Sequence, residues 1–442
     1  MSRDLSIYVH IPFCVRKCLY CDFLSAPASL AIQEQYLHRL CQEIGDKAAA
    51  FPEYRVSTVF FGGGTPTAVD AEGLCQVLET IFHYFNVDPD AEISLECNPG
   101  TASLQALRLY REAGFNRLSI GLQSADDGLL KTLGRIHTYE QFLQTFAWAR
   151  EAGFENINVD LMSALPGQTL AQYEDTLTRV LALKPEHISA YSLIVEEGTP
   201  FYEMELNLPD EDLDRLMYQR TGEILHEYGY ERYEISNYAL PGKECRHNLV
   251  YWERGAYLGL GLGAASLYDH TRYRNQSDLS KYLTWGMGEA DRKEENGLTL
   301  AESTGSLSRD EHITDVQKEQ SVMDIGQRHQ RSSGGEERNE TKNEKCTECR
   351  KEPYKEIYEE RQPLTPREEM EEFYFLGLRC MRGVSQSAFR AQFGGDAEGQ
   401  FKEAIESSIA DGLMERSADG DRLYLTPRGI DVSNMVFVRF LE

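Results

Sequence analysis

Between residue 5 and about residue 240, short apolar segments alternate with longer amphipathic ones, and this alternation narrows the possible folds more than any other property of the chain. Runs rich in β-branched and aromatic residues predict strands at 5–10, 57–61, 92–97, 117–121, 156–161 and 187–193. Apolar residues at helical spacing predict helices at 30–48, 71–85, 103–113, 139–152, 171–183 and 210–228. Alternation of this kind is typical of βα units around a parallel sheet. Six units predict an α/β fold with an incomplete (βα)6 barrel, not a closed barrel of eight strands.

The loops that leave the carboxyl ends of the strands carry the chemistry of a βα barrel, because packed side chains fill its interior. Most of the motifs described below lie at or just beyond the end of a predicted strand. We therefore expect a site built from several loops on one rim of the barrel.

The composition changes abruptly after Trp285. Residues 286–353 contain no Phe, Tyr or Trp, and Glu, Lys, Arg, Ser and Gln dominate, so little apolar surface is available to offset the entropy of ordering. We expect a disordered insertion at 288–355. It contains a C-x-x-C pair, Cys346 and Cys349, which we interpret as incidental because zinc would need two further ligands.

Order is expected to resume with a helix at 364–379, whose Pro-Arg-Glu-Glu start suits a helix N-terminus. The segment 383–394 resembles a helix-turn-helix, and 413–429 predicts a hairpin with an Asp-Gly turn. The predicted organisation is a barrel at 1–240, a closing segment at 241–287, the insertion at 288–355, and a small helical, winged-helix-like domain at 364–442.

The charge balance excludes some function classes. Seventy-two acidic side chains against 45 basic ones give a net charge of -27, which argues against a protein that coats nucleic acid. No apolar stretch approaches the roughly 18 residues that cross a bilayer, and the first residues lack a signal peptide. We expect a cytoplasmic protein without stable membrane insertion.

Three of the ten cysteines lie within eight residues, as Cys14-x-x-x-Cys18-x-x-Cys21, just beyond the first predicted strand. Three thiolates from one short loop can hold three iron corners of an iron-sulfur cluster and leave the fourth iron open as a reaction site. The alternative is a zinc site, which is normally closed by four protein ligands, and no fourth Cys or His follows at a suitable spacing. His10, within the first strand, is interpreted as a core residue.

This cysteine spacing resembles that of the radical S-adenosylmethionine (SAM) superfamily. The resemblance implies that the open iron chelates the amino and carboxylate groups of SAM, and that one electron from the cluster cleaves SAM to a 5′-deoxyadenosyl radical. The protein would then position and shield a cofactor that carries the difficult chemistry.

Further motifs narrow the resemblance to the oxygen-independent coproporphyrinogen oxidase family over about residues 5–285 and from 364 to the end. These motifs are YVHIPFC, GGGTPT, RLSIGLQS, LGRIH, VDLMSALPGQT and YEISNYA followed by GKECRHNLVYW. The resemblance implies that Cys14, Cys18 and Cys21 are the ligands of a [4Fe-4S] cluster. By the same resemblance, Tyr8 and Tyr20 flank the SAM pocket. The residues that match positions contacting SAM in that family are Gly63, Gly64, Thr65, Glu96, Gln123, Arg135 and Asp160.

Two features separate this chain from the true coproporphyrinogen dehydrogenases of the family. Those proteins carry a further cysteine two residues past the triplet and a longer N-terminal segment, whereas here that position is Phe23 and thirteen residues precede Cys14. The pattern resembles the HemW branch, radical SAM heme chaperones that bind heme and pass it to acceptor proteins. An electron donor such as a flavodoxin or ferredoxin would then be a second partner.

The motif His247-Asn248-x-x-Tyr251-Trp252 resembles the HNxxYW signature that this branch associates with heme. Histidine is a common axial ligand of heme iron, and aromatic rings pack against porphyrin faces. His247 is the candidate heme ligand, and Cys245 is a second soft donor. Alternatively, His247 and Trp252 only pack the last part of the barrel against its lid.

Three hypotheses follow from the sequence. The first is a heme chaperone that holds a cluster and SAM. The second is a coproporphyrinogen III dehydrogenase that decarboxylates propionate side chains by radical chemistry. The third is an iron-sulfur protein whose cluster only transfers electrons or braces the fold, which an open iron coordination site argues against. The identity of the heme acceptor and the oligomeric state have no signal in the sequence.

Overall fold

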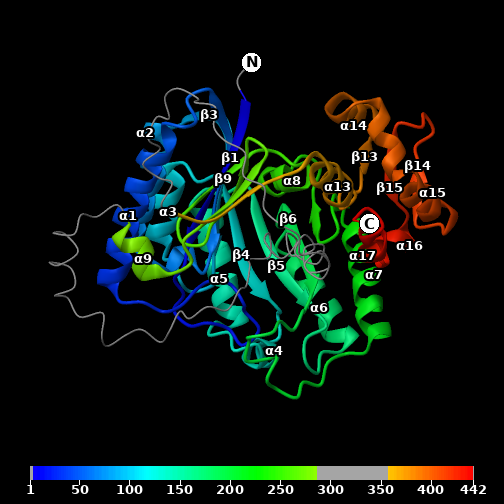
Figure 1. Ribbon diagram of the computed structural model, residues 1–442. Helices are drawn as coiled ribbons and strands as arrows, with labels where there is room; N and C mark the ends of the chain where they lie inside the picture. The colour runs from blue at the N-terminus through cyan, green and yellow to red at the C-terminus, as the bar shows by residue number, and fades with distance from the viewer. Residues whose placement is uncertain (1–2, 286–356, 442) are drawn as a thin grey trace, which may run out of the picture.

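The computed structural model describes residues 3–285 and 357–441 (Figure 1). Six parallel strands lie side by side in chain order, as predicted. They are β1 (Arg3–Ile11), β2 (Tyr54–Gly63), β3 (Asn86–Cys97), β4 (Arg117–Gln123), β5 (Ile157–Ser163) and β6 (His187–Ser192). The helices that follow them are α1 (Leu30–Ala48), α2 (Ala71–Tyr84), α3 (Leu104–Ala113), α4 (Asp127–Thr132), α5 (Tyr139–Glu151), α6 (Leu170–Leu181) and α7 (Glu211–Glu227). The predicted incomplete barrel is confirmed, while the short helix α4 was not predicted.

The sheet continues beyond both ends of this parallel core. Strand β9 (Tyr257–Leu260) pairs in parallel with β1, and β10 (Ala265–Tyr268), β11 (Thr271–Asn275) and β12 (Tyr358–Pro363) follow in antiparallel pairing. At the other edge, β8 (Asn237–Ala239) pairs with β6, and β7 (Glu231–Arg232) with β8. All of these strands except β12 have five residues or fewer, which is too short for a sequence pattern to reveal them. The predicted insertion at 288–355 and its cysteine pair lie outside the described residues.

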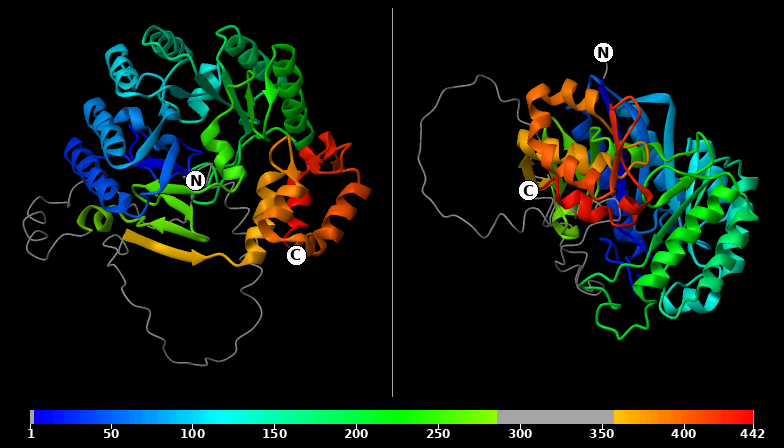
Figure 2. Two further views of the ribbon diagram at one scale, coloured as in Figure 1. Left: turned by 90° about the horizontal axis from the view of Figure 1, so that it is seen from above. Right: turned by 90° about the vertical axis from the view of Figure 1, so that its right-hand side faces the viewer.

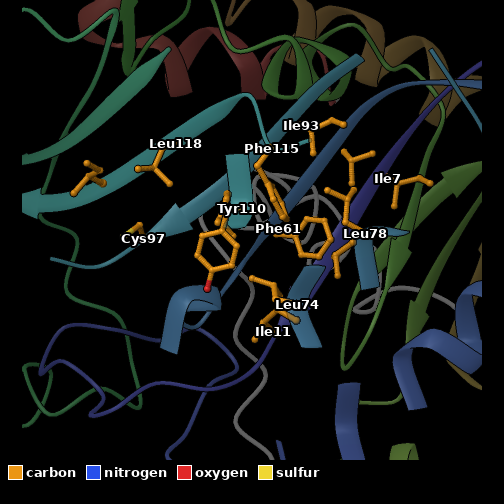
Figure 3. Packing of buried hydrophobic residues seen from close by; sticks show 14 of the residues in the cluster. Ile7, Ile11, Phe61, Leu74, Leu78, Ile93, Cys97, Tyr110, Phe115 and Leu118 are labelled. Atoms are coloured by element: carbon orange, nitrogen blue, oxygen red, sulfur yellow. The ribbon is translucent and has the colours of Figure 1, made fainter. Parts of the chain in front are cut away.

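Each parallel strand is buried on both faces. Figure 2 shows the helices on the outer side of the curved sheet, and Figure 3 shows the core between them, where Phe61 and Phe115 pack edge to face with ring centroids 5.0 Å apart. Residues at alternate positions face the opposite, inner side, because side chains alternate along a strand. This inner face is unusually polar, since it carries buried residues such as Glu92, Ser94 and Arg117.

Local signals set the helix boundaries. Thr138 and Thr169 each begin a helix with a reciprocal capping box, in which the threonine side chain accepts from the third helical residue and a Gln side chain returns the bond. Gly100, in the turn after β3, has φ +80°, a conformation that favours glycine. These signals explain why the predicted helix ends differ from the structure by no more than two residues.

The C-terminal domain consists of helices around a three-stranded antiparallel sheet with the order β13-β15-β14. Its elements are α13 (Pro366–Gly377), β13 (Val384–Ser385), α14 (Gln386–Phe393), α15 (Lys402–Ala410), β14 (Met414–Arg416), β15 (Arg422–Leu425), α16 (Pro427–Asp431) and α17 (Ser433–Val438), with a 3-10 segment at Gly395–Phe401. The predicted hairpin is β14–β15, and Gly420 in its turn has φ +76°. The prediction of a helix-turn-helix at 383–394 is wrong, because this segment holds one helix, α14, and pairs with α13 instead.

Helix α8 (Arg246–Trp252) lies between the barrel and the C-terminal domain (Figure 1). Arg254, just after α8, binds Glu369 at 3.0 Å and Glu372 at 2.6 Å, both on α13. Trp252 stacks under the Arg379 guanidinium, 4.6 Å from its ring centroid. A further helix of the barrel part is α9 (Leu279–Thr284). No helix in the described part of the chain is long and apolar enough to span a membrane.

Candidate functional site

The three cysteines of the triplet lie in the loop between β1 and α1, at the end of the sheet where β1–β6 terminate. Backbone hydrogen bonds fix this loop against its surroundings. Cys14 donates to Ala26, and Leu19 donates to Leu133 beyond α4, at 3.2 and 3.1 Å. Arg16 donates to the Gly134 carbonyl at 2.6 Å. The loop is thus held by the segment after β4, as expected of a site assembled on one rim.

The thiols of Cys14, Cys18 and Cys21 are half-buried and free of disulfides. Burial and the neighbouring thiols of the triplet raise the pKa of Cys21 to about 12, and burial likewise raises the pKa of Cys14. Among residues 3–285 and 357–441, no group of three or more His, Cys, Asp or Glu side chains is already arranged to hold a metal ion. The donor set nevertheless fits a cluster by its chemistry, because three thiols emerge from one loop and soft thiolates are the preferred ligands of iron-sulfur clusters.

The glycine-rich segment at the end of β2 and just beyond it lies against this loop. Gly63 has φ +109°, and an added Cβ would come within 2.5 Å of the His10 ring. At Gly64 a Cβ would come within 2.6 Å of the Phe13 carbonyl oxygen. Thr65 lies beside the triplet, with its Oγ1 3.4 Å from Cys14 Sγ. Only glycine permits this close approach of β2 to the cysteine loop.

The end of β3 connects to the glycine segment and to Arg135. Glu96 Oε2 accepts from the Gly63 backbone N–H at 3.2 Å. Asn98 donates to Thr65 at 2.7 Å and accepts from Arg135 at 2.8 Å. Arg135 also donates to Cys18 Sγ at 3.7 Å and to the Gly121 carbonyl. Sequence reasoning did not single out Asn98, although its place directly after a strand, in Asn-Pro-Gly, is a signal that could have found it.

The residues from β4 and β5 complete the rim. Gln123 ends β4 with φ +74°, a conformation uncommon for a residue other than glycine, and its Oε1 accepts from the Tyr191 hydroxyl at 3.2 Å. Asp160 lies on the inner face of β5 and accepts from Asn158 at 2.7 Å and from Ser119 at 3.3 Å. Burial raises its pKa. The structure thus brings Gly63, Gly64, Thr65, Glu96, Gln123, Arg135 and Asp160 to the carboxyl half of one sheet.

The two tyrosines occupy different positions. Tyr20 lies in the cysteine loop near Phe201, with ring centroids 6.5 Å apart. Tyr8 is buried on the inner face, and its hydroxyl lies 3.0 Å from His10 Nδ1. The second nitrogen of His10, Nε2, lies 2.9 Å from the Leu24 carbonyl oxygen of the cysteine loop. His10 is buried as predicted, and it also connects the inner face to that loop.

His247 lies at the opposite end of the sheet, on α8, while α4 lies at the end with the cysteine loop (Figure 1). Both of its ring nitrogens have partners: Nδ1 lies 2.8 Å from the Thr58 hydroxyl and Nε2 lies 3.0 Å from the Tyr251 hydroxyl. Burial, and then the nearby charge of Arg117, lower its pKa to about 3. In this conformation His247 packs α8 against the barrel, and ligation of iron would require it to give up one of these hydrogen bonds.

Comparisons with known proteins agree with this architecture. The model of the radical SAM superfamily matches residues 8–180, and the model of the HemN C-terminal domain matches residues 364–432. Coproporphyrinogen III oxidase (HemN) from Escherichia coli, a solved structure, has the same fold, with a TM-score of 0.74 at 23% identity over 99% of this chain and 90% of that one.

Relatives of known name are closer in sequence. Heme chaperone HemW from Bacillus subtilis (strain 168) is 33% identical over 441 residues, which cover 99% of each chain. The proteins of the same name from Synechocystis sp. and Escherichia coli (strain K12) are 39% and 38% identical over 289 and 261 residues, covering 63% and 59% of this chain and 69% of each relative. A likeness that runs through both domains over nearly the whole length shows that the chain belongs to the HemW family of radical SAM proteins.

Proposed function

We propose that this chain is a heme chaperone, which binds heme and passes it to an acceptor protein, and that it holds a [4Fe-4S] cluster together with SAM. The observation that carries the proposal is the full-length likeness to a heme chaperone HemW, over 441 residues and both domains. The likeness to HemN concerns the fold alone at 23% identity. Phe23, at the position where the dehydrogenases have a further cysteine, also favours the chaperone over the decarboxylase.

In this proposal Cys14, Cys18 and Cys21 hold the cluster, which supplies one-electron chemistry when it is reduced by an electron donor. The polar groups on the carboxyl half of the sheet bind SAM. The Gly63–Thr65 segment offers close backbone approach, Glu96 and Asp160 offer carboxylates to accept hydrogen bonds from hydroxyl groups, and Gln123 offers a side-chain amide. Arg135 donates a hydrogen bond to Cys18 Sγ and places a positive charge beside the cysteine loop.

For heme we retain His247 as the candidate ligand. Among the described residues, the Tyr251 hydroxyl is the one hydrogen-bond partner of its Nε2, so exchange of that bond would free the nitrogen for iron. Two residues upstream, Cys245 is completely buried and within 3.5 Å of Glu92, which makes it the poorer donor because burial raises the pKa of its thiol to about 12.

The test is a heme titration of protein reconstituted without oxygen. We expect iron and sulfide in the wild type, their loss when the cysteine triplet is replaced by serine, and a Soret band on addition of heme. His247→Ala should weaken that band, whereas Tyr251→Phe, which removes the competing hydrogen bond but keeps the ring, should not. Unchanged heme binding in His247→Ala would exclude His247, and a wild type without a Soret band would contradict the proposed function.

A second incubation separates the chaperone from the decarboxylase. With coproporphyrinogen III, reductant and SAM, we expect no protoporphyrinogen. Its formation would favour a dehydrogenase. Release of 5′-deoxyadenosine in the same sample would show that SAM is cleaved, which a purely structural cluster would not do.

A further inference from the structure

Arg117 lies at the start of β4 on the polar inner face of the sheet, and only 2% of its surface is exposed. Its Nε has no hydrogen-bond partner. Across residues 3–285 and 357–441, no hydrogen bond or ion pair to the Arg117 guanidinium is found, although the group carries five N–H donors. A buried charge is normally paired, because removal from water is costly.

Ser94 on β3 is the direct cross-strand neighbour of Arg117. Both residues point to the inner face, since Ile93, Leu95 and Leu118 fill the core on the other side. Ser94 is completely buried, and its hydroxyl oxygen also has no hydrogen-bond partner within the part of the chain that the structure describes. Two adjacent donors are therefore unused at one place in the interior.

The nearest carboxylates are already engaged with other donors. Glu92 accepts from the backbone N–H groups of Arg246 and His247 at the start of α8, both at 3.0 Å, and from Cys245 Sγ at 3.5 Å. Asp160 accepts from Asn158 and Ser119. Neither of these two carboxylates forms an ion pair or a hydrogen bond with Arg117.

The surroundings keep Arg117 charged. Burial alone would lower its pKa, but Cys245, Glu92 and Tyr233 nearby raise it overall. A further anion beside Arg117 is thus compatible with the local electrostatics.

We propose that Arg117 and Ser94 form an anchor for a carboxylate, and that this carboxylate is a propionate of the heme. The guanidinium offers two parallel N–H donors, the arrangement that matches a carboxylate, and the Ser94 hydroxyl offers a third donor. The assignment of the carboxylate to heme rests on the proposed function, because heme carries two propionates.

The experiment compares the binding of heme with that of heme dimethyl ester, in which both carboxylates are masked. We expect the wild-type protein to bind heme at least tenfold more tightly than the ester, since charge-assisted hydrogen bonds are the strong ones. Arg117→Met should reduce this ratio to about one while leaving the affinity for the ester unchanged. Ser94→Ala should reduce the ratio of heme to ester affinity in part. If Arg117→Met does not fold, this smaller reduction in Ser94→Ala becomes the test, and an unchanged ratio would count against the anchor.

The melting temperature of the ligand-free protein gives an independent readout. Replacing an unpaired buried charge by an apolar side chain of similar length should leave the melting temperature unchanged or raise it. The matched control is Arg39→Met. Arg39 is also buried, but it donates to Gln42 at 2.6 Å and stacks on Trp285, so its loss should lower the melting temperature and leave the heme-to-ester ratio intact.

Several outcomes would overturn the anchor. A preserved ratio in Arg117→Met would show that this arginine does not bind a propionate. A fall in the ligand-free melting temperature like that of Arg39→Met would show that Arg117 is already satisfied in the empty protein, for example by ordered water. Equal binding of heme and its ester by the wild type would overturn the anchor but leave heme binding standing, whereas a wild type that binds neither would overturn the proposed function itself.

Discussion

The ion pair between Glu43 and Lys47 on α1 is completely buried, and we predict that its two halves depend strongly on each other. Lys47 Nζ lies 2.8 Å from Glu43 Oε1, and both side chains have no exposed surface. Lys47 also donates to the Gly259 carbonyl at 3.1 Å and to Asn275 at 2.9 Å. The pair thereby fastens α1 to β9 and β11, next to the strand that leads into the cysteine loop.

The expected loss of unfolding free energy in each single variant depends on the hydrogen bonds that the remaining charged group keeps. Lys47→Met leaves a buried carboxylate that still accepts from the Gly261 N–H, from Asn275 and from the Tyr282 hydroxyl, at 2.9, 2.8 and 2.6 Å. Breaking a buried pair by removing one partner costs about 3–5 kcal/mol, and these three donors place Lys47→Met near the lower end. Glu43→Leu should cost a similar amount, because it leaves the ammonium group with two neutral acceptors.

The double variant, Glu43→Leu with Lys47→Met, removes both charges together. It should be less destabilised than the sum of the single variants by about 2 kcal/mol or more, because neither charge is then left unpaired. Urea unfolding of cluster-free protein, followed by far-ultraviolet circular dichroism, measures all four proteins of the cycle. Additive effects within about 0.5 kcal/mol would refute the reasoning, since additivity is the behaviour of independent sites.

Three further predictions concern the site and the domain contact. Gly63→Ala should destabilise the protein by about 2–5 kcal/mol and lower the amount of iron it can bind. A positive φ costs about 1–3 kcal/mol for residues other than glycine, and the new Cβ would overpack the His10 ring. An iron content equal to that of the wild type after reconstitution would contradict this. Burial lowers the pKa of His10 to about 4 and that of His137 to about 3, so both histidines stay neutral in the folded protein down to those pH values. In the unfolded chain they take up a proton below about pH 6.5. The free energy of unfolding should therefore fall below that pH by about 1.4 kcal/mol per pH unit for each histidine, until its folded pKa is reached. Urea midpoints that stay constant from pH 7 to 5 would count against it. Arg254→Met should weaken the attachment of the C-terminal domain by about 1.5–3 kcal/mol, because Glu369 and Glu372 each lose a hydrogen bond from a charged donor but keep their contacts to His270 and Arg272. Limited proteolysis should then separate the two domains faster than in the wild type.

Much of the barrel could be predicted because its signals are local. The 3.6-residue period of α1, the Thr capping boxes of α5 and α6, and the apolar runs of β1–β6 each lie within a short window of the chain. The strands at the sheet edges could not be predicted, because β7 has two residues and β12 pairs with β11 across 71 undescribed residues, 286–356. The helix-turn-helix prediction failed because the segment 383–394 holds the short strand β13 and a single helix, α14. The helix that α14 packs against, α13, comes from an earlier segment of the chain.

The site also has features that the sequence predicted and features that only the tertiary structure decided. The residue types and spacing of Cys14, Cys18 and Cys21 were determined along the chain, since covalent connectivity alone puts three thiols on one loop. The glycine run at Gly63 was also visible in the sequence, but its close approach to His10 is a contact between distant segments. Only the folded sheet decided that both nitrogens of His247 are engaged at the far end from those thiols. It also decided that Arg117 lies beside Ser94 and that neither the Arg117 Nε nor the Ser94 hydroxyl has a hydrogen-bond partner among residues 3–285 and 357–441. The partners of His247 and Arg117 depend on strand register and on which side chains from distant segments come into contact. The free-energy cost of leaving a polar group without a partner arises only when the tertiary structure buries that group.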